Sequence, residues 1–193
     1  MSSTITYGNV KLVSPFDILH LNELKIEKEY NEHARIFLTG VIPSDKKDSY
    51  IDSVSSKDIL EVCQIADNSS TTVLFKGVIT NIEIKAVRGI FYIIVEGVSC
   101  TYELDIKLKK RSFQNKDMLY TAMIKEVIKD YSGADFIDTS AKSEKLGKVV
   151  IQYNETDWEF LKRMASHFNV GLVPDAASDK PKFWFGIPNS SSS

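Results

Sequence analysis

The sequence predicts a mainly β protein with an α+β part: a β-barrel followed by a small α/β domain with the element order α-β-α-β-β. Short apolar stretches with the two-residue period of strands fill the first part of the chain. Stretches with helical periodicity begin only near residue 112, and a further pair of strand-like segments follows them. We therefore expect a barrel domain over residues 1–111, an α+β domain over 112–188 and a disordered tail over 189–193.

Two antiparallel hairpins are predicted in the barrel part. Residues 24–30 (LKIEKEY) alternate apolar and charged side chains, and residues 34–42 (ARIFLTGVI) resume the strand pattern after a short interruption. Residues 59–66 (ILEVCQIA) and 72–80 (TVLFKGVIT) form the second pair and are joined through the turn-forming stretch DNSS. Each pair is close enough in sequence to fold as a hairpin.

The second hairpin carries signs of strong curvature. Gly77 lies inside a strand, where glycine is typical of a bulge or of a close approach by another backbone. The parity of the apolar residues changes between Ile79 and Ile82, which indicates a bend of the kind found at barrel corners. Residues 87–89 (VRG) are expected to form a turn that leads into the next strand.

Two more strands are predicted before the chain changes character. Residues 90–97 (IFYIIVEG) form a continuous apolar run, which predicts burial on both faces. Residues 100–110 (CTYELDIKLKK) alternate cleanly, which predicts a strand with one apolar face. That face would carry Tyr102, Leu104, Ile106 and Leu108. About seven strands at such short spacing indicate a sandwich or a barrel, and the bend favours a barrel.

The α+β part begins with a predicted helix. Asn115 is placed to cap a helix over residues 116–131 (KDMLYTAMIKEVIKDY), and Ser132 with Gly133 would end it. A strand over residues 148–153 (KVVIQY) follows.

The segment after this strand has the signature of a helix start. Thr156 and Glu159 have the spacing of a capping box, in which a hydroxyl and a carboxylate satisfy the first free amides of a helix. Apolar residues at helical spacing run from Leu161 to Phe168. A hairpin within residues 170–188 then closes the domain.

Composition and charge exclude several function classes. The chain has 193 residues, of which 43% are hydrophobic, so it can bury one large or two small cores. A net charge of -2 predicts neither nucleic-acid nor anionic-membrane partners. Cys63 and Cys100 lie in apolar runs and are expected to be buried free thiols. The start of the sequence has no signal-peptide pattern, and no apolar stretch is long enough to span a bilayer, so we expect synthesis in a reducing cytoplasm.

We expect no enzymatic activity, no cofactor and no metal. Glu155, Asp157 and Glu159 lie within one helix start, whereas catalytic carboxylate pairs usually flank a cleft from separate elements. The three histidines have no zinc-ligand spacing, and the sequence has neither a nucleophile elbow nor a phosphate-binding glycine loop. The basic cluster KLKKR at 107–111 lacks a platform of aromatic residues for bases, and we interpret it as a solvated strand end or a protein-binding edge.

Three stretches in register carry a resemblance to a known family. The segments LFKGVITNIEI, SCTYELDIKLKKRSFQNKD and VIQYNETDWEFLKRMASHFNVGLVPD resemble the late control protein D family of contractile-tailed phages and the VgrG spike proteins of type VI secretion. The similarity covers roughly residues 73 to 187. The first 70 residues are similar only in being rich in strands.

The resemblance rests on three short motifs, the first of which contains Phe75, Gly77 and Ile79. The second, the barrel-exit motif, comprises Leu104, Asp105, Arg111, Ser112, Phe113 and Gln114. The third, the strand-helix motif, comprises Gln152, Tyr153, Glu155, Thr156, Asp157, Trp158, Phe160, Leu161 and Arg163, and Glu159 completes its capping box. We expect both of these motifs to have structural roles.

What the resemblance implies is a structural baseplate hub, a spike adaptor that joins the inner tube of a contractile injection machine to its trimeric spike. Family members have tube-protein-like barrels, two per chain, so that three chains present a six-barrel ring to the hexameric tube. The implied partners are the inner-tube protein, the spike protein and other baseplate proteins. The implied location is a phage virion, tailocin or type VI-like injection particle, assembled from protein made in the bacterial cytoplasm.

Family members are longer than this chain, which has room for one barrel and the α/β domain. The resemblance therefore implies either the amino-terminal part of a hub or a short variant. The longer protein would be a homotrimer, whereas this chain alone could be monomeric with an open barrel. Two alternatives stay open: a free-standing adhesion or carbohydrate-binding β module with Phe183 and Trp184 as an aromatic platform, and a cell-wall hydrolase.

Overall fold

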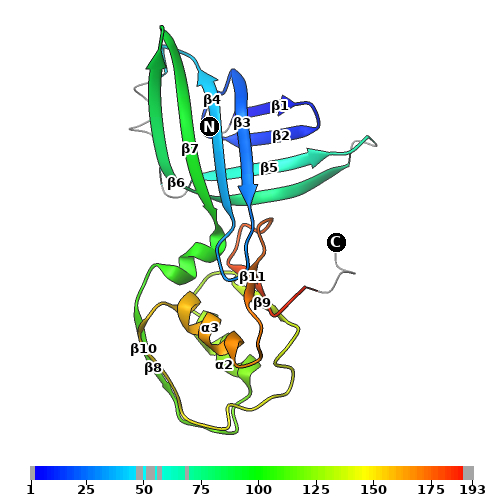
Figure 1. Ribbon diagram of the computed structural model, residues 1–193, viewed down its shortest axis with the longest axis vertical. Coiled ribbons are helices and arrows are strands. Elements are labelled where there is room, and N and C mark those ends of the chain that lie inside the picture. The colour runs from blue at the N-terminus through cyan, green and yellow to red at the C-terminus, as the bar shows by residue number, and fades with distance from the viewer. Residues whose placement is uncertain (1–2, 47–49, 51–54, 56–57, 68–69, 189–193) are drawn as a thin grey trace. The chain divides into compact units, whose positions relative to one another are not determined.

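The computed structural model describes residues 3–46, 50, 55, 58–67 and 70–188, and the predicted tail at 189–193 lies outside the described residues. The chain divides into two compact units (Figure 1). The first contains residues 1–28, 34–99 and 176–179. The second contains residues 29–33, 100–175 and 180–193. The division into a barrel domain over residues 1–111 and an α+β domain over residues 112–188 stays a prediction.

The first unit is a curved, seven-stranded antiparallel sheet with the strand order β1-β2-β5-β6-β7-β4-β3. Its strands are β1 (Ser3–Tyr7), β2 (Val10–Ser14), β3 (His20–Glu27), β4 (Arg35–Ile42), β5 (Ile59–Ile65), β6 (Thr71–Val87) and β7 (Ile90–Ser99). The outermost strands of the described sheet, β1 and β3, do not pair with each other. The sheet is therefore an open half-barrel, and the predicted fold class is confirmed.

Both predicted hairpins are present. β3 pairs with β4, and β5 pairs with β6. The predicted turn after Val87 is also present, because Arg88 and Gly89 have φ values of 52° and 84° between the paired residues Val87 and Ile90. Two successive positive φ values are typical of the tight turns that join twisted antiparallel strands.

The curvature predicted in β6 has a physical cause. A Cβ atom added to Gly77 would lie 2.2 Å from the carbonyl oxygen of Val98 on β7, so only glycine allows the two strands this approach. The pairing register with β7 shifts between Ile79 and Asn81, which is the expected position of the change in parity. The strand therefore bends where the sequence predicts.

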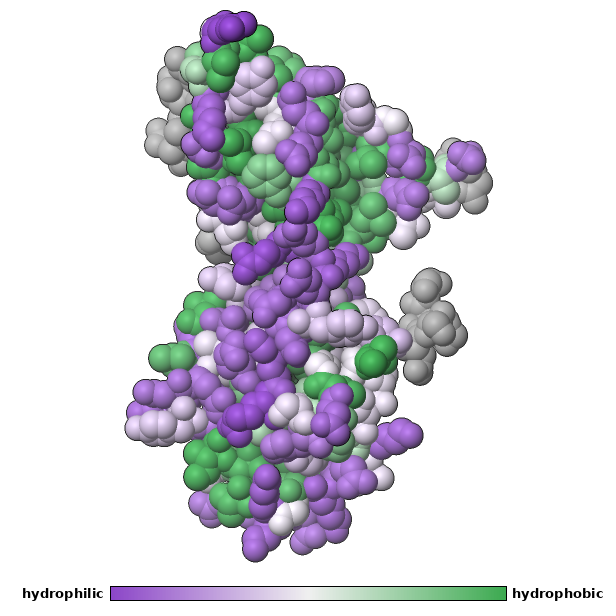
Figure 2. All heavy atoms as spheres, in the orientation of Figure 1, coloured by the Kyte–Doolittle hydropathy of each residue, from purple (hydrophilic) through white to green (hydrophobic). Residues whose placement is uncertain are grey.

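The core of the first unit lies on one face of the sheet. Leu38, Leu60, Phe75 and Val95 are completely buried there. The prediction that β7 is buried on both faces is wrong in part. Ile93 and Val95 are buried, but the residue between them and the residues before them are only half-buried or exposed. Figure 2 shows hydrophobic residues among polar ones on the visible surface of these strands.

The second unit combines small sheets with two helices. Its elements are a 3-10 helix η1 (Cys100–Asp105), β8 (Lys109–Phe113), α2 (Tyr120–Ile128), β9 (Asp135–Asp138), β10 (Val150–Glu155), α3 (Asp157–Ser166), β11 (Leu172–Pro174) and β12 (Lys182–Phe185). β8 and β10 form an antiparallel ribbon, and β12 lies between an antiparallel β11 and a parallel β9. The predicted closing hairpin is therefore present, whereas β9 was not predicted.

The strand predicted over residues 100–110 is wrong except for Lys109 and Lys110, which begin β8. The chain instead forms a 3-10 helix over Cys100–Asp105, in which Thr101 and Leu104 are both completely buried. A 3-10 helix has three residues per turn, so residues three apart share a face. The supposed apolar strand face is split, because Tyr102, Ile106 and Leu108 are exposed.

The first predicted helix is shorter than expected. α2 begins at Tyr120 rather than at residue 116, and Leu119 occupies the N-cap position without a side-chain hydrogen bond. The Oδ1 atom of Asn115 accepts a hydrogen bond of 2.9 Å from the backbone N–H of Asp117, which closes a local turn. Asn115 therefore stabilises a local turn before α2 and does not cap the helix.

A second core fills this unit, and α3 contributes Trp158, Phe160, Leu161 and Met164 to it. Cys63 and Cys100 are buried thiols outside any disulfide bond, as predicted. Within the described part of the chain, no helix is both long enough and apolar enough to cross a membrane.

The close approach at Gly77 predicts a stability effect. Gly77→Ala should lower the free energy of unfolding by roughly 1–3 kcal/mol, because the added methyl group forces β6 and β7 apart. Chemical denaturation would measure this loss. Thr80→Ala, an exposed change on the same strand, is the matched control. Equal stability of the two variants would contradict the explanation given for Gly77.

Candidate functional site

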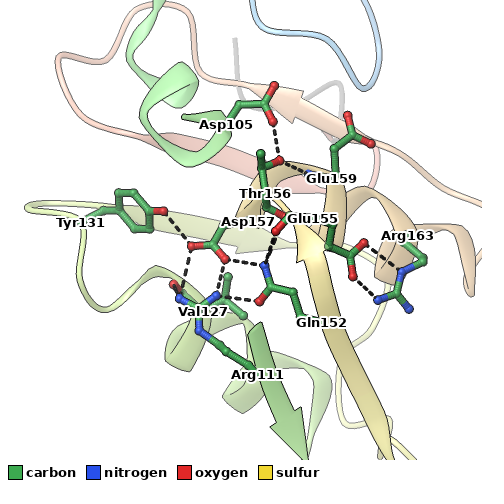
Figure 3. Close-up of polar contacts among 10 residues, drawn as sticks. All are labelled: Asp105, Arg111, Val127, Tyr131, Gln152, Glu155, Thr156, Asp157, Glu159 and Arg163. Carbon is green, nitrogen blue, oxygen red and sulfur yellow. Dashed lines mark hydrogen bonds and ion pairs between the residues drawn. The ribbon is translucent and has the colours of Figure 1, made fainter. Parts of the chain in front are cut away.

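Two motifs that are distant in sequence meet in a buried polar network (Figure 3). Arg111, from the barrel-exit motif, lies on β8, and Asp157, from the strand-helix motif, is the first residue of α3. The guanidinium Nη1 pairs with Oδ1 of Asp157, and Nη2 donates to Oδ2 at 3.2 Å. The Asp157 side chain is 0% exposed and that of Arg111 19%, so this is a two-pronged ion pair largely shielded from water.

Gln152 completes the link between β10 and α3. Its Oε1 atom accepts a hydrogen bond of 2.7 Å from Arg111, and its Nε2 atom donates to Asp157 Oδ1 at 2.8 Å. The same Nε2 atom lies 3.2 Å from the backbone carbonyls of both Glu155 and Thr156. A completely buried amide thus has partners on both of its polar atoms, as a stable buried network requires.

The region of α2 supplies the last members of the network. The hydroxyl of Tyr131, three residues after the helix, donates to Asp157 Oδ2 at 2.7 Å. Burial, the hydrogen bond to Asp157 and the negative charge of that residue raise the pKa of Tyr131 well above its ordinary value. Arg111 Nη2 also lies 3.4 Å from the carbonyl oxygen of Val127 on α2. The network therefore ties β8, β10, α2 and α3 together.

The start of α3 shows one half of the predicted capping box. Thr156 is the N-cap residue, and its Oγ1 atom accepts a hydrogen bond of 3.2 Å from the backbone N–H of Glu159. The carboxylate of Glu159 accepts from Lys162 at 3.0 Å and does not serve as the second half of the box. Instead, the hydroxyl of Thr156 donates to Asp105 of the barrel-exit motif. The Thr156 side chain thus both caps α3 and links the two motifs.

A second, more exposed ion pair fixes α3 to β10. Arg163 Nε donates to Glu155 Oε2 at 3.2 Å, and its Nη2 atom donates to the carbonyl oxygen of Ile151 at 2.8 Å. The Arg163 guanidinium also lies 5.2 Å from the centre of the Phe160 ring. Glu155 and Asp157 therefore each have an arginine partner.

The remaining motif residues divide between core and surface. Buried members are Leu104, Phe113, Trp158, Phe160 and Leu161. Ser112, Gln114 and Tyr153 are exposed. β10 also runs past Tyr153, the expected end of the strand, because Asn154 adopts a φ of 51° and a register shift carries the pairing on to Glu155.

Sequence reasoning missed Asn31 and His33, which belong to the second unit although they follow β3 in sequence. The indole Nε1 of Trp158 donates to the carbonyl oxygen of Asn31 at 2.9 Å, and Asn31 Oδ1 accepts from the Leu172 N–H at 2.9 Å. His33 lies 2.9 Å from Thr101 Oγ1 and 3.4 Å from Asp105 Oδ2. Asn31 has a φ of 66°, and asparagine at an interruption between strands was the available signal.

The network is suited to holding elements together rather than to catalysis. The Asp157 carboxylate accepts from Arg111, Gln152 and Tyr131, so no free lone pair faces solvent. Across the described segments, no group of three or more histidine, cysteine or acidic residues could hold a metal ion. The arrangement holds four elements together, and the carboxylate of Asp157 is not accessible to a substrate.

Phe183 and Trp184 do not form the exposed aromatic platform that a carbohydrate-binding module would need. Phe183 is 1% exposed and packs in the core, where its ring centre lies 5.8 Å from that of Trp158. Trp184 is half-buried and lines a shallow cavity of about 200 Å³ together with Asp135, Ile137 and Lys182. A single partly buried indole presents much less stacking area than the platform requires.

The double role of Thr156 predicts a measurable loss. Thr156→Ala removes the N-cap acceptor and the donor to Asp105, and we expect it to lower the free energy of unfolding by about 1 kcal/mol or slightly more. Thr156→Ser keeps the hydroxyl and is the matched control. Denaturant titration of both variants measures the difference, and an unchanged midpoint for the alanine variant would contradict the assigned cap.

Comparison with known proteins supports the fold. No protein-family profile matches the chain, and no curated protein matches its sequence. Among solved structures, it is similar to a tail protein from Neisseria meningitidis MC58, with a TM-score of 0.66 and 14% identity over 97% of this chain and 53% of that one. A 43 kDa tail protein of prophage MuSo2 from Shewanella oneidensis gives a TM-score of 0.66 and 14% identity over 91% and 52% of the two chains.

A third similar structure is the E. coli c3393 protein, described as a component of the type VI secretion system with structural similarity to the T4 bacteriophage tail proteins gp27 and gp5. Its TM-score is 0.55, with 18% identity over 95% of this chain and 48% of that one. The chain thus spans about half the length of each of these three solved structures. It shares its fold with the matching part of these phage tail and type VI secretion proteins.

Proposed function

We propose that this chain is a structural baseplate hub component, an adaptor between the inner tube and the trimeric spike of a contractile phage tail, tailocin or type VI-like injection system. The observation that carries the proposal is the fold match. An open half-barrel and a small α+β unit together match a phage tail protein over 97% of the chain. At 14% identity this match is evidence of fold, and the function is our inference from it.

The form of the first unit supports a role in assembly. Its described sheet is open and ends in β1 and β3, and the edges of an open sheet can pair with strands of another chain. Glu23, Lys25 and Glu27 are exposed on β3, and charged residues on an edge strand discourage indiscriminate pairing. An edge of this kind is suited to a specific partner such as an inner-tube subunit.

The second unit supports a structural rather than an enzymatic role. The acidic stretch at the start of α3 is used for one buried ion pair, Arg111–Asp157, one more exposed pair, Arg163–Glu155, and the Thr156 helix cap. We therefore expect substitution of Asp157 to destabilise the protein without removing any catalytic turnover. Membership of the late control protein D or VgrG group, a homotrimeric hub, and assembly into a virion or injection particle are parts of the same proposal.

Light scattering after size-exclusion chromatography tests the proposal. The samples are this chain and the product of the longest open reading frame that contains it. We expect a trimer for the longer product, because an adaptor to a three-fold spike must share its symmetry. When the inner-tube protein from the same gene cluster is added, electron microscopy should show tubes with the longer product bound at one end.

A longer product that stays monomeric at high concentration and does not associate with the tube protein would contradict the hub role. That outcome would favour a free-standing adhesion module. The Thr156→Ser variant, which keeps the cap, is a suitable folded control in the assembly assay.

A further inference from the structure

The outer face of the β8–β10 ribbon is an exposed surface that the fold leaves without a described partner. Tyr153 pairs with Lys110, and Ile151 pairs with Ser112. These residues are all exposed, whereas the alternate positions on β10, such as Gln152, are buried. The ribbon therefore has one face in the core of its unit and one face in solvent.

This outer face is unusually apolar for a solvated strand. Val149, Ile151 and Tyr153 are 48%, 56% and 67% exposed and succeed one another at every second position. Leu108, just before β8, is 65% exposed. Single exposed apolar residues are ordinary, whereas exposed apolar residues that adjoin one another on one strand face form a contiguous patch, and such patches are often interaction sites.

The stripe is bordered by positive charge. Lys110 extends over the Tyr153 ring, with its Nζ atom 4.9 Å from the ring centre. Lys107 and Lys148 are exposed in the segments adjoining the two strands. The nearby carboxylate of Glu155 is already paired with Arg163. In Figure 2, hydrophobic and hydrophilic residues adjoin one another at the lower left, where Figure 1 labels β8 and β10.

We propose that the outer face of the β8–β10 ribbon, defined by Leu108, Lys110, Val149, Ile151 and Tyr153, docks an extended acidic segment of a partner protein. The partner's apolar side chains contact the stripe, and its carboxylates pair with Lys110 and the adjoining lysines. Residues two apart on a strand recur every 6.4–6.8 Å or so, a spacing that alternating apolar residues of an extended segment match.

The positive charge around the stripe favours an acidic segment over two other possible partners, a second copy of the chain and a nucleic acid. Two copies of the chain joined through the same face would bring equivalent lysines together, which is unfavourable. A nucleic acid is disfavoured because the chain has a net charge of -2, without the basic excess typical of nucleic-acid-binding proteins, and because Arg111 is engaged with Asp157. The inference goes beyond the hub proposal and does not depend on it, because it rests only on the ribbon.

Fluorescence anisotropy with three labelled synthetic peptides tests the inference. One peptide alternates glutamate and valine, the second alternates lysine and valine, and the third alternates glutamate and serine. The glutamate–valine peptide should bind at least about tenfold more tightly than the other two, and its affinity should fall with added salt.

Two substitutions on the ribbon should each weaken binding of the glutamate–valine peptide by at least about tenfold: Ile151→Asp, which removes apolar contact and adds repulsion, and Lys110→Glu, which reverses the local charge. Ile137→Asp on β9 is the matched control, because Ile137 is 55% exposed, close to the 56% of Ile151. All three positions are exposed, so circular dichroism should show folded variants.

Three kinds of result would overturn the inference. The first is a failure of the peptide test itself: either equal binding of the acidic and basic peptides, or peptide binding that Ile151→Asp leaves unchanged. The second is tighter, Lys110-dependent binding of a DNA duplex or of phosphatidylserine vesicles, which would assign the face to a nucleic acid or a membrane surface. The third is a concentration-dependent dimer abolished by Ile151→Asp, which would assign it to a second copy of the chain.

Discussion

The buried ion pair between Arg111 and Asp157 is the interaction on which the second unit depends. It joins the strand that follows η1 to the first turn of α3, and Gln152 and Tyr131 extend it to β10 and to the end of α2. Removing a charge from water costs several kcal/mol, and only a complete set of partners offsets that cost. Because every oxygen of Asp157 is used, the elements around it have little freedom to shift independently.

This arrangement gives a physical meaning to the two sequence motifs. They are separated by about forty residues and meet at two places. Arg111 reaches Gln152 and Asp157 in the buried network, and Asp105 accepts from Thr156 at the start of α3. A cluster of acidic residues near an aromatic helix could suggest an active site. Here the carboxylates of Asp157 and Glu155 are each paired with an arginine and connect α3 to the neighbouring strands.

Much of the fold could be predicted because local patterns and tertiary contacts agree in it. The hairpins β3–β4 and β5–β6, the turn at Arg88 and Gly89, and the bend near Gly77 follow from strand alternation and from what glycine permits. The Thr156 cap also follows from local chemistry. In these segments, neighbours in sequence are also neighbours in space.

The errors arise where distant contacts decide the structure. Alternation over residues 100–110 predicts a strand, but burial of Thr101 and Leu104 on one side of η1 favours a 3-10 helix. Asn115 resembles a helix cap and forms a turn instead. The link of Asn31 to Trp158 spans most of the chain, and no local signal identifies Trp158 as its partner. The motif resemblance identifies Arg111 and Asp157 as motif residues, but their contact follows only from the fold.

A double-mutant cycle of Arg111→Ala and Asp157→Asn, followed by the free energy of unfolding in denaturant, tests the central claim that this pair holds the two motifs together. Each single change should cost roughly 3–5 kcal/mol, since each leaves a buried polar group without its partner. The double variant should be less destabilised than the sum, with a coupling energy of about 1–3 kcal/mol. Strictly additive losses, or singles close to the wild-type stability, would contradict the claim.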